Sequence, residues 1–189
     1  MLKLRVPKVG TAALSILLGG CLSAYAQSDV TQPGDPIIAS SANSPGSEGV
    51  ANAIDGQPTK YLNFDSGRDG ATAGFSPSGF VVTPSVGLTL VTGIAMESAN
   101  DGPERDPKAI TLEGSNDDTI TNFNSGTWEM ITTVTNIPVF TARFQKQTLS
   151  FTNFKPYKHY RWIVTETATT PNGCCLQIAE VEFLGTVLP

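Results

Sequence analysis

Short strand-like segments separated by turn residues recur along the chain, and this rhythm limits the fold more than any other feature of the sequence. In residues 159–167, Tyr160, Trp162 and Val164 alternate with mostly polar side chains, which is the period of a strand with one buried face. Similar segments are expected at residues 36–39, 61–65, 79–83, 88–97, 109–113, 128–134, 143–151 and 176–185. So many short strands predict an all-β fold, an antiparallel β-sandwich or jelly roll, with Trp162 in its core.

A turn-rich loop precedes one of these strands. Residues 100–103 read Asn-Asp-Gly-Pro; Gly accepts positive φ, Pro fixes φ, and Asn or Asp can bond the nearby backbone. Residues 109–113 then alternate apolar and polar side chains, as a half-buried strand does. We expect residues 109–118 to be framework and residues 100–106 to form a surface loop that can carry a site.

The first 26 residues have the pattern of a secretion signal. Lys3, Arg5 and Lys8 precede an apolar run over residues 11–20, and residues 24–26 read Ala-Tyr-Ala, a small-x-small ending. The pattern predicts a secreted, periplasmic or cell-surface protein.

A bacterial lipobox is the alternative interpretation of the same segment. Residues 18–21 read Leu-Gly-Gly-Cys, and lipidation of Cys21 would tether the protein to a membrane. The apolar run is too short to span a bilayer, and no other stretch approaches ~20 apolar residues, so no transmembrane segment is expected. After the signal we expect a flexible leader at residues 27–35 and a single domain at residues 36–187.

The charge of the chain argues against two classes of partner. The formal charge is -5, and loss of the three basic residues of the signal would leave 9 Lys and Arg against 17 Asp and Glu, a charge of -8. An acidic surface disfavours nucleic acid and anionic membranes.

Two of the three cysteines, Cys174 and Cys175, are adjacent. They can remain reduced as small buried residues, join each other, or bridge to another molecule. They lack the ligand spacing of a zinc site.

The last expected strand has an irregular apolar pattern. Leu176 and Ile178 face one way, and the apolar phase then moves to Val181 and Phe183. Either a bulge lies near Glu180, or its carboxylate points inward. An inward carboxylate is costly unless a cation or hydrogen bonds satisfy it.

A second carboxylate, Asp55, lies in a Gly/Pro turn at residues 51–59. Such a turn exposes backbone carbonyls, and oxygen-rich loops of this kind suit Ca²⁺. Taken alone, Asp55-Gly56 is equally an ordinary turn, and only its pairing with Glu180 favours a metal.

With these segments in order, the chain resembles the galactose-binding-like β-sandwiches, namely discoidin or coagulation-factor type C domains and family 32 carbohydrate-binding modules, as found in exported bacterial proteins. The resemblance covers residues 36–185. It rests on VANAIDG at residues 50–56, on residues 105–117, on Tyr160-Arg161 and on IAEVEFLG at residues 178–185.

This resemblance implies a structural Ca²⁺ that ties the early Asp-Gly loop to the last strand. Asp55 and Glu180 would supply side-chain oxygens, and Asn52, Gln57 and Thr59 would supply carbonyl or hydroxyl oxygens. The sequence departs from the family pattern after Thr59, where Lys60 and Leu62 replace the usual Thr and Trp.

In the family, variable loops at one end of the sandwich bind sugars. A sugar needs an aromatic face for its C–H groups and directional partners for its hydroxyls. The residues expected to provide them here are Tyr61, Arg68, Asn100, Asp101, Arg105 and Asn172. Core packing is the alternative for Tyr61, and an ion pair with Asp101, Glu104 or Asp106 is the alternative for Arg105.

The sequence offers little to an enzyme. It has one histidine, His159, and contains no nucleophile elbow, zinc-protease motif or phosphate-binding glycine loop. We therefore expect a non-catalytic module for a glycan or another extracellular surface ligand. The alternative is a structural or adhesive protein that assembles through its β-sandwich surfaces.

Overall fold

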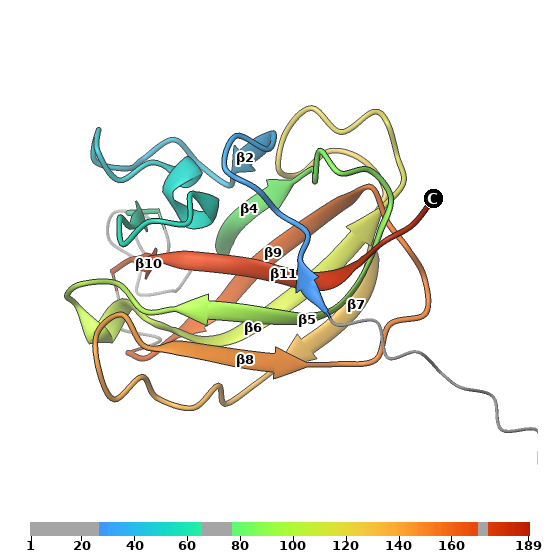
Figure 1. Cartoon of the computed structure of the whole chain (residues 1–189). Helices are drawn as coiled ribbons and strands as arrows, with labels where there is room; N and C mark the ends of the chain where they lie inside the picture. Colours follow the sequence, from blue (N-terminus) through green and yellow to red (C-terminus); the bar gives the residue numbers. More distant parts are fainter. Residues whose placement is uncertain (1–26, 66–76, 170–173) are drawn as a thin grey trace, which may run out of the picture.

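The computed structural model describes residues 27–65, 77–169 and 174–189. Its strands form two antiparallel sheets packed face to face, so the predicted all-β sandwich is confirmed (Figure 1). One sheet has the order β1-β11-β5-β8 and the other β2-β4-β9-β6-β7, while β10 and β3 form a separate pair.

The first sheet contains β1 (Ser28–Asp29), β11 (Glu180–Val187), β5 (Thr89–Glu97) and β8 (Lys146–Ser150). The second contains β2 (Ile37–Ala39), β4 (Ser78–Val82), β9 (His159–Thr167), β6 (Pro107–Ser115) and β7 (Glu129–Val134). The small pair is β3 (Tyr61–Asn63) with β10 (Leu176–Ile178).

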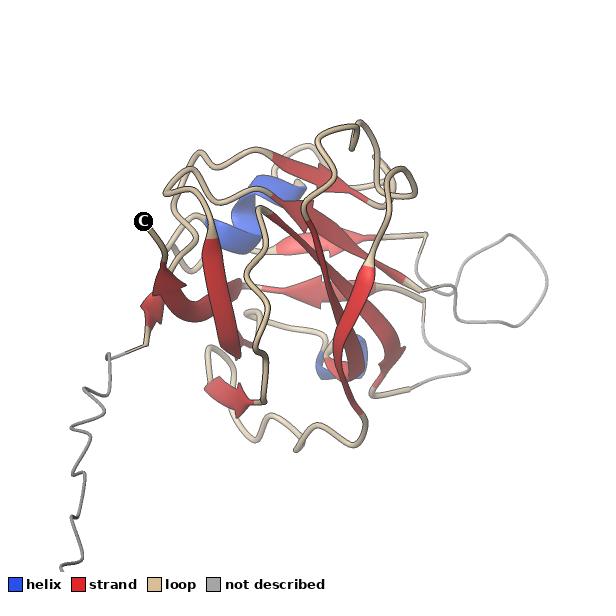
Figure 2. Cartoon of the chain, turned by 90° about the vertical axis from the view of Figure 1, so that its right-hand side faces the viewer, coloured by secondary structure: helices blue, strands red, loops and turns tan. Residues whose placement is uncertain are grey.

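Helical structure in the described residues is limited to two short 3-10 turns outside the sheets (Figure 2). They are η1 (Val50–Ile54) and η2 (Pro103–Arg105). Among the described residues, no helix has the length and apolar character needed to cross a membrane.

The core lies between the two sheets and is built around aromatic side chains. Trp162 and Tyr160 of β9 are fully buried, as their alternation predicts. Phe80 of β4 packs against Trp162 with ring centroids 5.2 Å apart, and Phe183 of the opposite sheet lies 5.7 Å from Tyr160. Phe183 therefore stabilises the packing of the two sheets through ring contacts as well as through burial of its apolar surface.

Residues 27–35 are part of the sandwich, in contrast to the flexible leader expected from their composition. β1 pairs with β11, and the Val30 amide donates to the Phe183 carbonyl at 2.8 Å. The Val30 side chain is buried, and Asp29 Oδ1 accepts a hydrogen bond from the Phe183 amide at 3.0 Å. A short edge strand of this kind carries too little apolar alternation to be detected in sequence.

The segment expected as one strand at residues 176–185 is two strands. β10 pairs with β3, whereas β11 pairs with β5. Between them the Ala179 amide donates to the Glu97 carbonyl at 2.9 Å. This change of partner explains why the apolar phase shifts at Glu180, which is itself buried.

Candidate functional site

The loop after η1 is organised around Asp55. Its Oδ1 accepts from the Gln57 amide at 2.8 Å, and its Oδ2 accepts from the Thr59 hydroxyl at 2.5 Å. Gly56 between them has a φ of 67°, a value that glycine adopts at no steric cost. The Asn52 side-chain Nδ2 donates to the Ser47 and Lys60 carbonyls, both at 2.9 Å, and so closes the base of the loop.

Glu180 reaches this loop from the first residue of β11. Glu180 is only 6% exposed, and its Oε2 accepts a hydrogen bond from the Gly56 amide at 3.1 Å. Burial, followed by the charges of Asp55, Asp29 and Glu182, raises the pKa of Glu180 to about 8. The structure therefore brings Asp55, Gln57, Thr59 and Glu180 into one region, whereas the Asn52 side chain braces the backbone.

A hollow of about 180 Å³ lies beside Glu180. Its lining residues include Glu97, Glu180, Glu182 and Lys146. Lys146 pairs with Glu182 at 2.5 Å, which leaves Glu180 with an amide as its partner. In the described part of the chain, no three His, Cys, Asp or Glu side chains are arranged to hold a metal ion, so a cation here would also need backbone oxygens.

Lys60, which follows the Asp55 loop, forms the centre of a separate ion cluster. Its Nζ lies 2.8 Å from Asp101 Oδ1 and 3.7 Å from Glu48 Oε1, and its side chain is only 10% exposed. The hydrogen bond from Lys60 lowers the pKa of Asp101. The ammonium is thus directed at these two acids, which explains how a lysine is accommodated next to the Asp55 loop.

An open hollow of about 510 Å³ adjoins this cluster. Its lining residues are Ser47, Glu48, Pro58, Thr59, Lys60, Asn100 and Phe144. Phe144 is 43% exposed and has a φ of 56°, an unusual value for a residue other than glycine. The hollow therefore combines an accessible aromatic ring with charged and amide groups, and we call it the Phe144 hollow.

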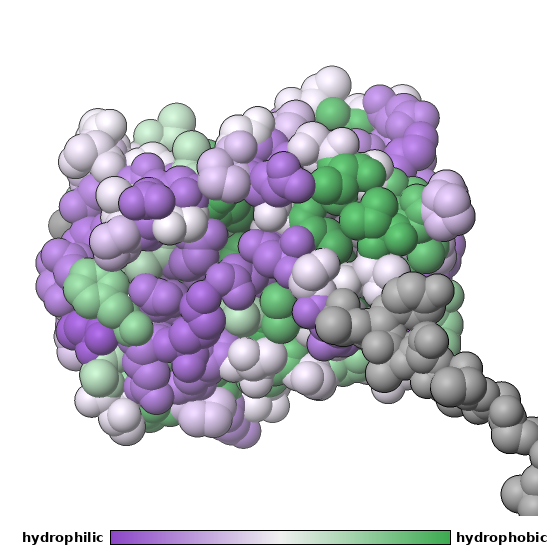
Figure 3. Space-filling view, viewed as in Figure 1, coloured by the Kyte–Doolittle hydropathy of each residue, from purple (hydrophilic) through white to green (hydrophobic). Residues whose placement is uncertain are grey.

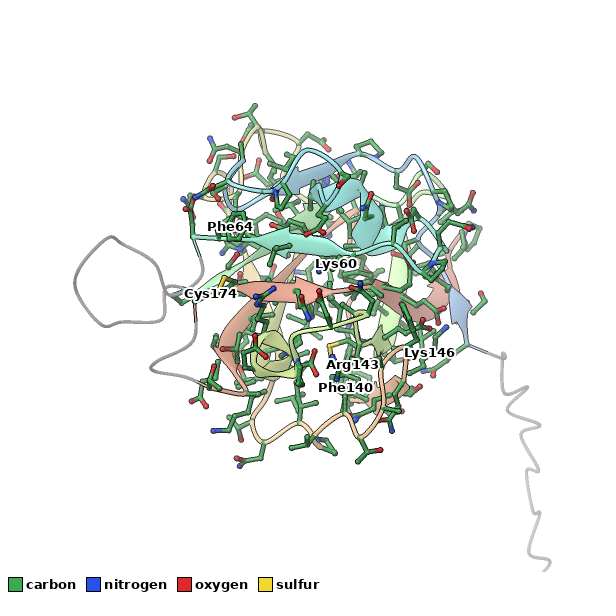
Figure 4. The ribbon with its side chains drawn as sticks, turned by 90° about the vertical axis from the view of Figure 1, so that its left-hand side faces the viewer. Lys60, Phe64, Phe140, Arg143, Lys146 and Cys174 are labelled. Carbon is green, nitrogen blue, oxygen red and sulfur yellow. A yellow bond between two sulfur atoms is a disulfide. The ribbon has the colours of Figure 1, made fainter. Side chains whose placement is uncertain are left out.

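Figure 4 views this side of the molecule, with Lys60 near the middle and Arg143 and Lys146 on the neighbouring elements. Cys174, which precedes β10, and Phe64, which follows β3, lie at the same end of this strand pair, at the left of the view. Hydrophilic residues predominate at the left of Figure 3, at the end of the sandwich where β10 lies in Figure 1.

The loop between β5 and β6 is fixed by residues from distant parts of the chain. Gln177 of β10 donates to the Asp101 carbonyl and to the Gly102 carbonyl, the latter at 3.0 Å. Arg143 donates two hydrogen bonds to Asp106, at 3.0 Å to Oδ1 and 2.6 Å to Oδ2. Burial raises the pKa of Asp106, and the contact with Arg143 opposes that shift.

The residues predicted to bind a ligand have different fates. Asn100 lines the Phe144 hollow, and Asp101 bonds Lys60 next to it. Arg105 lies 3.3 Å from Glu104, which is one of the three ion pairs considered for it. Arg68 and Asn172 lie outside the described residues.

The prediction that Tyr61 binds a ligand is wrong, because its ring is fully buried and has no access to a surface ligand. Its hydroxyl accepts a hydrogen bond from the Asn63 side chain at 2.9 Å. Conversely, sequence reasoning missed Phe144 and Lys60 as site residues. Phe144 has no signal in the sequence, since it reads as part of an ordinary strand at residues 143–151, whereas β8 begins only at Lys146.

Cys174 and Cys175 form a disulfide at the entrance to β10, so the adjacent pairing is the one found among the alternatives. Cys175 is buried and Cys174 is half-buried.

His159 is half-buried. Its Nδ1 lies 2.7 Å from the Thr83 hydroxyl, and burial lowers the pKa of its imidazole.

Solved structures of similar shape include modules whose descriptions name a bound sugar or a sugar polymer. A family 32 carbohydrate-binding module from Clostridium perfringens, in complex with GalNAc-β-1,3-galactose, has a TM-score of 0.60 at 16% identity and covers 82% of this chain and 98% of its own. Chitosan-binding module 1 of a chitosanase/glucanase from Paenibacillus sp. IK-5 has a TM-score of 0.58 at 17% identity, covering 82% and 97%. A fucolectin from striped bass, Morone saxatilis, has a TM-score of 0.57 at 18% identity, covering 85% and 50%.

No protein-family model and no curated protein matches the sequence. The structural likeness establishes the fold, which is the galactose-binding-like β-sandwich of discoidin domains and family 32 modules. The resemblance recognised in the sequence is confirmed at this level.

Proposed function

We propose that this galactose-binding-like β-sandwich is a non-catalytic module that binds carbohydrate in the Phe144 hollow. The observation that carries the proposal is the position of an exposed aromatic ring beside a fixed set of polar groups. A sugar ring can place its C–H face on Phe144, while its hydroxyls bond Asn100 and the ion cluster of Lys60.

The ion cluster gives the hollow rigidity. Lys60 is held by Asp101 and Glu48, and the loop that carries Asp101 is held by Gln177. Groups that are already in position lose little conformational entropy when a ligand binds, which suits recognition in a shallow site.

The sugars of the similar structures guide the choice of ligand. One module was solved with GalNAc-β-1,3-galactose, and another is described as chitosan-binding. These are the first probes for this chain. The signal-like start of the sequence further supports a role outside the cytoplasm, where such glycans occur.

We further propose a structural Ca²⁺ held by Asp55 and Glu180 together with oxygens of the Gln57–Thr59 segment. Glu180 is buried, and its hydrogen-bond partner among the described residues is the Gly56 amide. A buried carboxylate in that setting is stabilised by a cation. The ion would join the early loop to the last strand and would support the neighbouring Lys60 cluster, with no role in chemistry.

A glycan array with polysaccharide pull-down tests the binding proposal. The expected result is retention of galactose-type or glucosamine-type glycans by the wild type, lost in Phe144→Ala. Val187→Ala is the control, because Val187 has a similar exposure, 44%, and lies outside the hollow. Equal loss in both variants, or no glycan bound by the wild type, would contradict the proposal.

A further inference from the structure

Strand β7 is an open edge of the five-stranded sheet. It pairs with β6 and has no second neighbour in the sheet order of the described residues. The backbone N–H and C=O groups along the outer side of an edge strand are available to another strand.

The edge formed by β7 has one charged side chain, Glu129 at its first residue, and that carboxylate is held in an ion pair with Lys155. Residues 130–142 contain no charged side chain, in a chain whose formal charge is -5. The other edges are guarded, since β1 has 2 residues, β2 has 3 residues, and β8 begins with Lys146. Short strands and edge lysines are the devices by which sheets avoid association.

Two exposed apolar side chains lie at the start of this strand. Met130 in β7 is 69% exposed, and Phe154 is 91% exposed. Phe154 is close to β7 because its neighbour Lys155 pairs with Glu129, and the Tyr157 hydroxyl lies 3.3 Å from the same carboxylate. Exposed aromatic and methionine side chains are common at the centres of protein interfaces.

We propose that β7 is a self-association edge, on which β7 of a second copy of this chain adds in antiparallel orientation. An identical strand across a two-fold axis places uncharged residues 130–134 against uncharged residues, and such a contact closes on itself. Elsewhere two acidic copies repel each other, so the neutral edge is the surface at which they can approach. Phe154 and Met130 then bury apolar surface at the junction.

This surface lies outside the Phe144 hollow, and the inference does not depend on glycan binding. A dimer would nevertheless present two hollows, which strengthens binding to a surface that displays many copies of a glycan.

Sedimentation equilibrium over a wide range of protein concentration tests the proposal. The wild type is expected to approach twice its monomer mass as concentration rises. Thr133→Lys, on the exposed side of β7, is expected to stay monomeric, because two-fold pairing brings the two new charges together. Thr148→Lys makes the same change on the exposed side of β8 and is expected to dimerise as the wild type does.

A wild type that is monomeric at every concentration overturns the proposal. So does association that Thr148→Lys abolishes and Thr133→Lys does not, since that result assigns the contact to β8. Hydrogen exchange of the β7 amides in the wild type gives a readout that requires no variant. Their protection is expected to rise with protein concentration, and protection independent of concentration overturns the proposal.

Discussion

The Gly56 amide donates a hydrogen bond to Glu180 Oε2 at 3.1 Å, and this contact links residues 124 positions apart in the sequence. It ties the loop after η1 to the first residue of β11. Because Glu180 is buried and lies near Asp55, Asp29 and Glu182, ionisation of its carboxyl group is unfavourable. The stability of this part of the fold should therefore respond to protons and to cations.

Without a bound cation, the contribution of Glu180 to the stability of the protein should fall as pH rises from about 4.5 to about 8. The pKa of Glu180 is raised from 4.5 to about 8 in the folded state. Between those values the folded state retains a proton that the unfolded chain has released, so this contribution to the free energy of unfolding decreases with pH. Urea denaturation in chelator across this pH range measures the slope.

Glu180→Gln is the matched variant for this pH dependence, since it keeps the shape and removes the titration. Its slope is expected to be shallower than that of the wild type. Identical slopes for the two proteins would show that Glu180 does not titrate as described.

Calcium should raise the melting temperature, and more so at pH 8 than at pH 5. A cation that binds only the folded state stabilises it in proportion to the logarithm of its concentration. At pH 5 protons compete for Glu180, whereas at pH 8 much of the carboxylate is ionised. Thermal unfolding with Ca²⁺ and with chelator gives the shift, and Asp55→Ala should abolish it. A shift that persists in Asp55→Ala would place the cation elsewhere.

Removal of the Arg143 side chain should cost about 3 kcal/mol of unfolding free energy, because it leaves the buried Asp106 carboxylate without its partner. Lys108→Ala is the control. Lys108 pairs with Glu166 at 3.4 Å with both side chains exposed, and such pairs contribute about 1 kcal/mol or less. Urea denaturation of both variants measures the two losses of unfolding free energy. Equal losses would contradict the conclusion that the buried Asp106 carboxylate depends on its pair with Arg143.

Gly79→Ala should destabilise the protein strongly, whereas Gly46→Ala should be close to neutral. A Cβ at Gly79 would lie 1.9 Å from the Trp162 carbonyl oxygen, so β4 and β9 would have to separate. A Cβ at Gly46 meets nothing within 4 Å. Overpacking of this kind costs on the order of 1–3 kcal/mol or more. Melting temperatures that fall equally in both variants would be inconsistent with the close approach at Gly79.

Much of the fold could be predicted from the sequence because buried strands have a strong period. Tyr160 and Trp162 alternate on β9 as expected, and their rings lie in the core. β1 could not be found, since its 2 residues are exposed and carry no alternation. The division of the last strand at Ala179 depends on a change of sheet partner, which a local pattern records only as a phase shift.

The candidate site was less predictable, because its residues meet only through the fold. Glu180 could be singled out, since a carboxylate is unusual at the point where the alternation of apolar residues changes phase. Phe144 could not be singled out, because the sequence of a strand-like segment does not distinguish an exposed aromatic residue from a buried one. The pair Arg143 and Asp106, 37 residues apart, likewise depends on how the loops meet.

Chemical-shift mapping by two-dimensional NMR tests the central claim, carbohydrate binding in the Phe144 hollow, most directly. The probes are N-acetylgalactosamine and chitosan oligomers, titrated into the isotope-labelled protein with Ca²⁺ present. The predicted result is a saturable set of shifts concentrated at the amides of Glu48, Lys60, Asn100 and Phe144. Saturable shifts centred on another surface, or no saturable shift with either probe, would contradict the account.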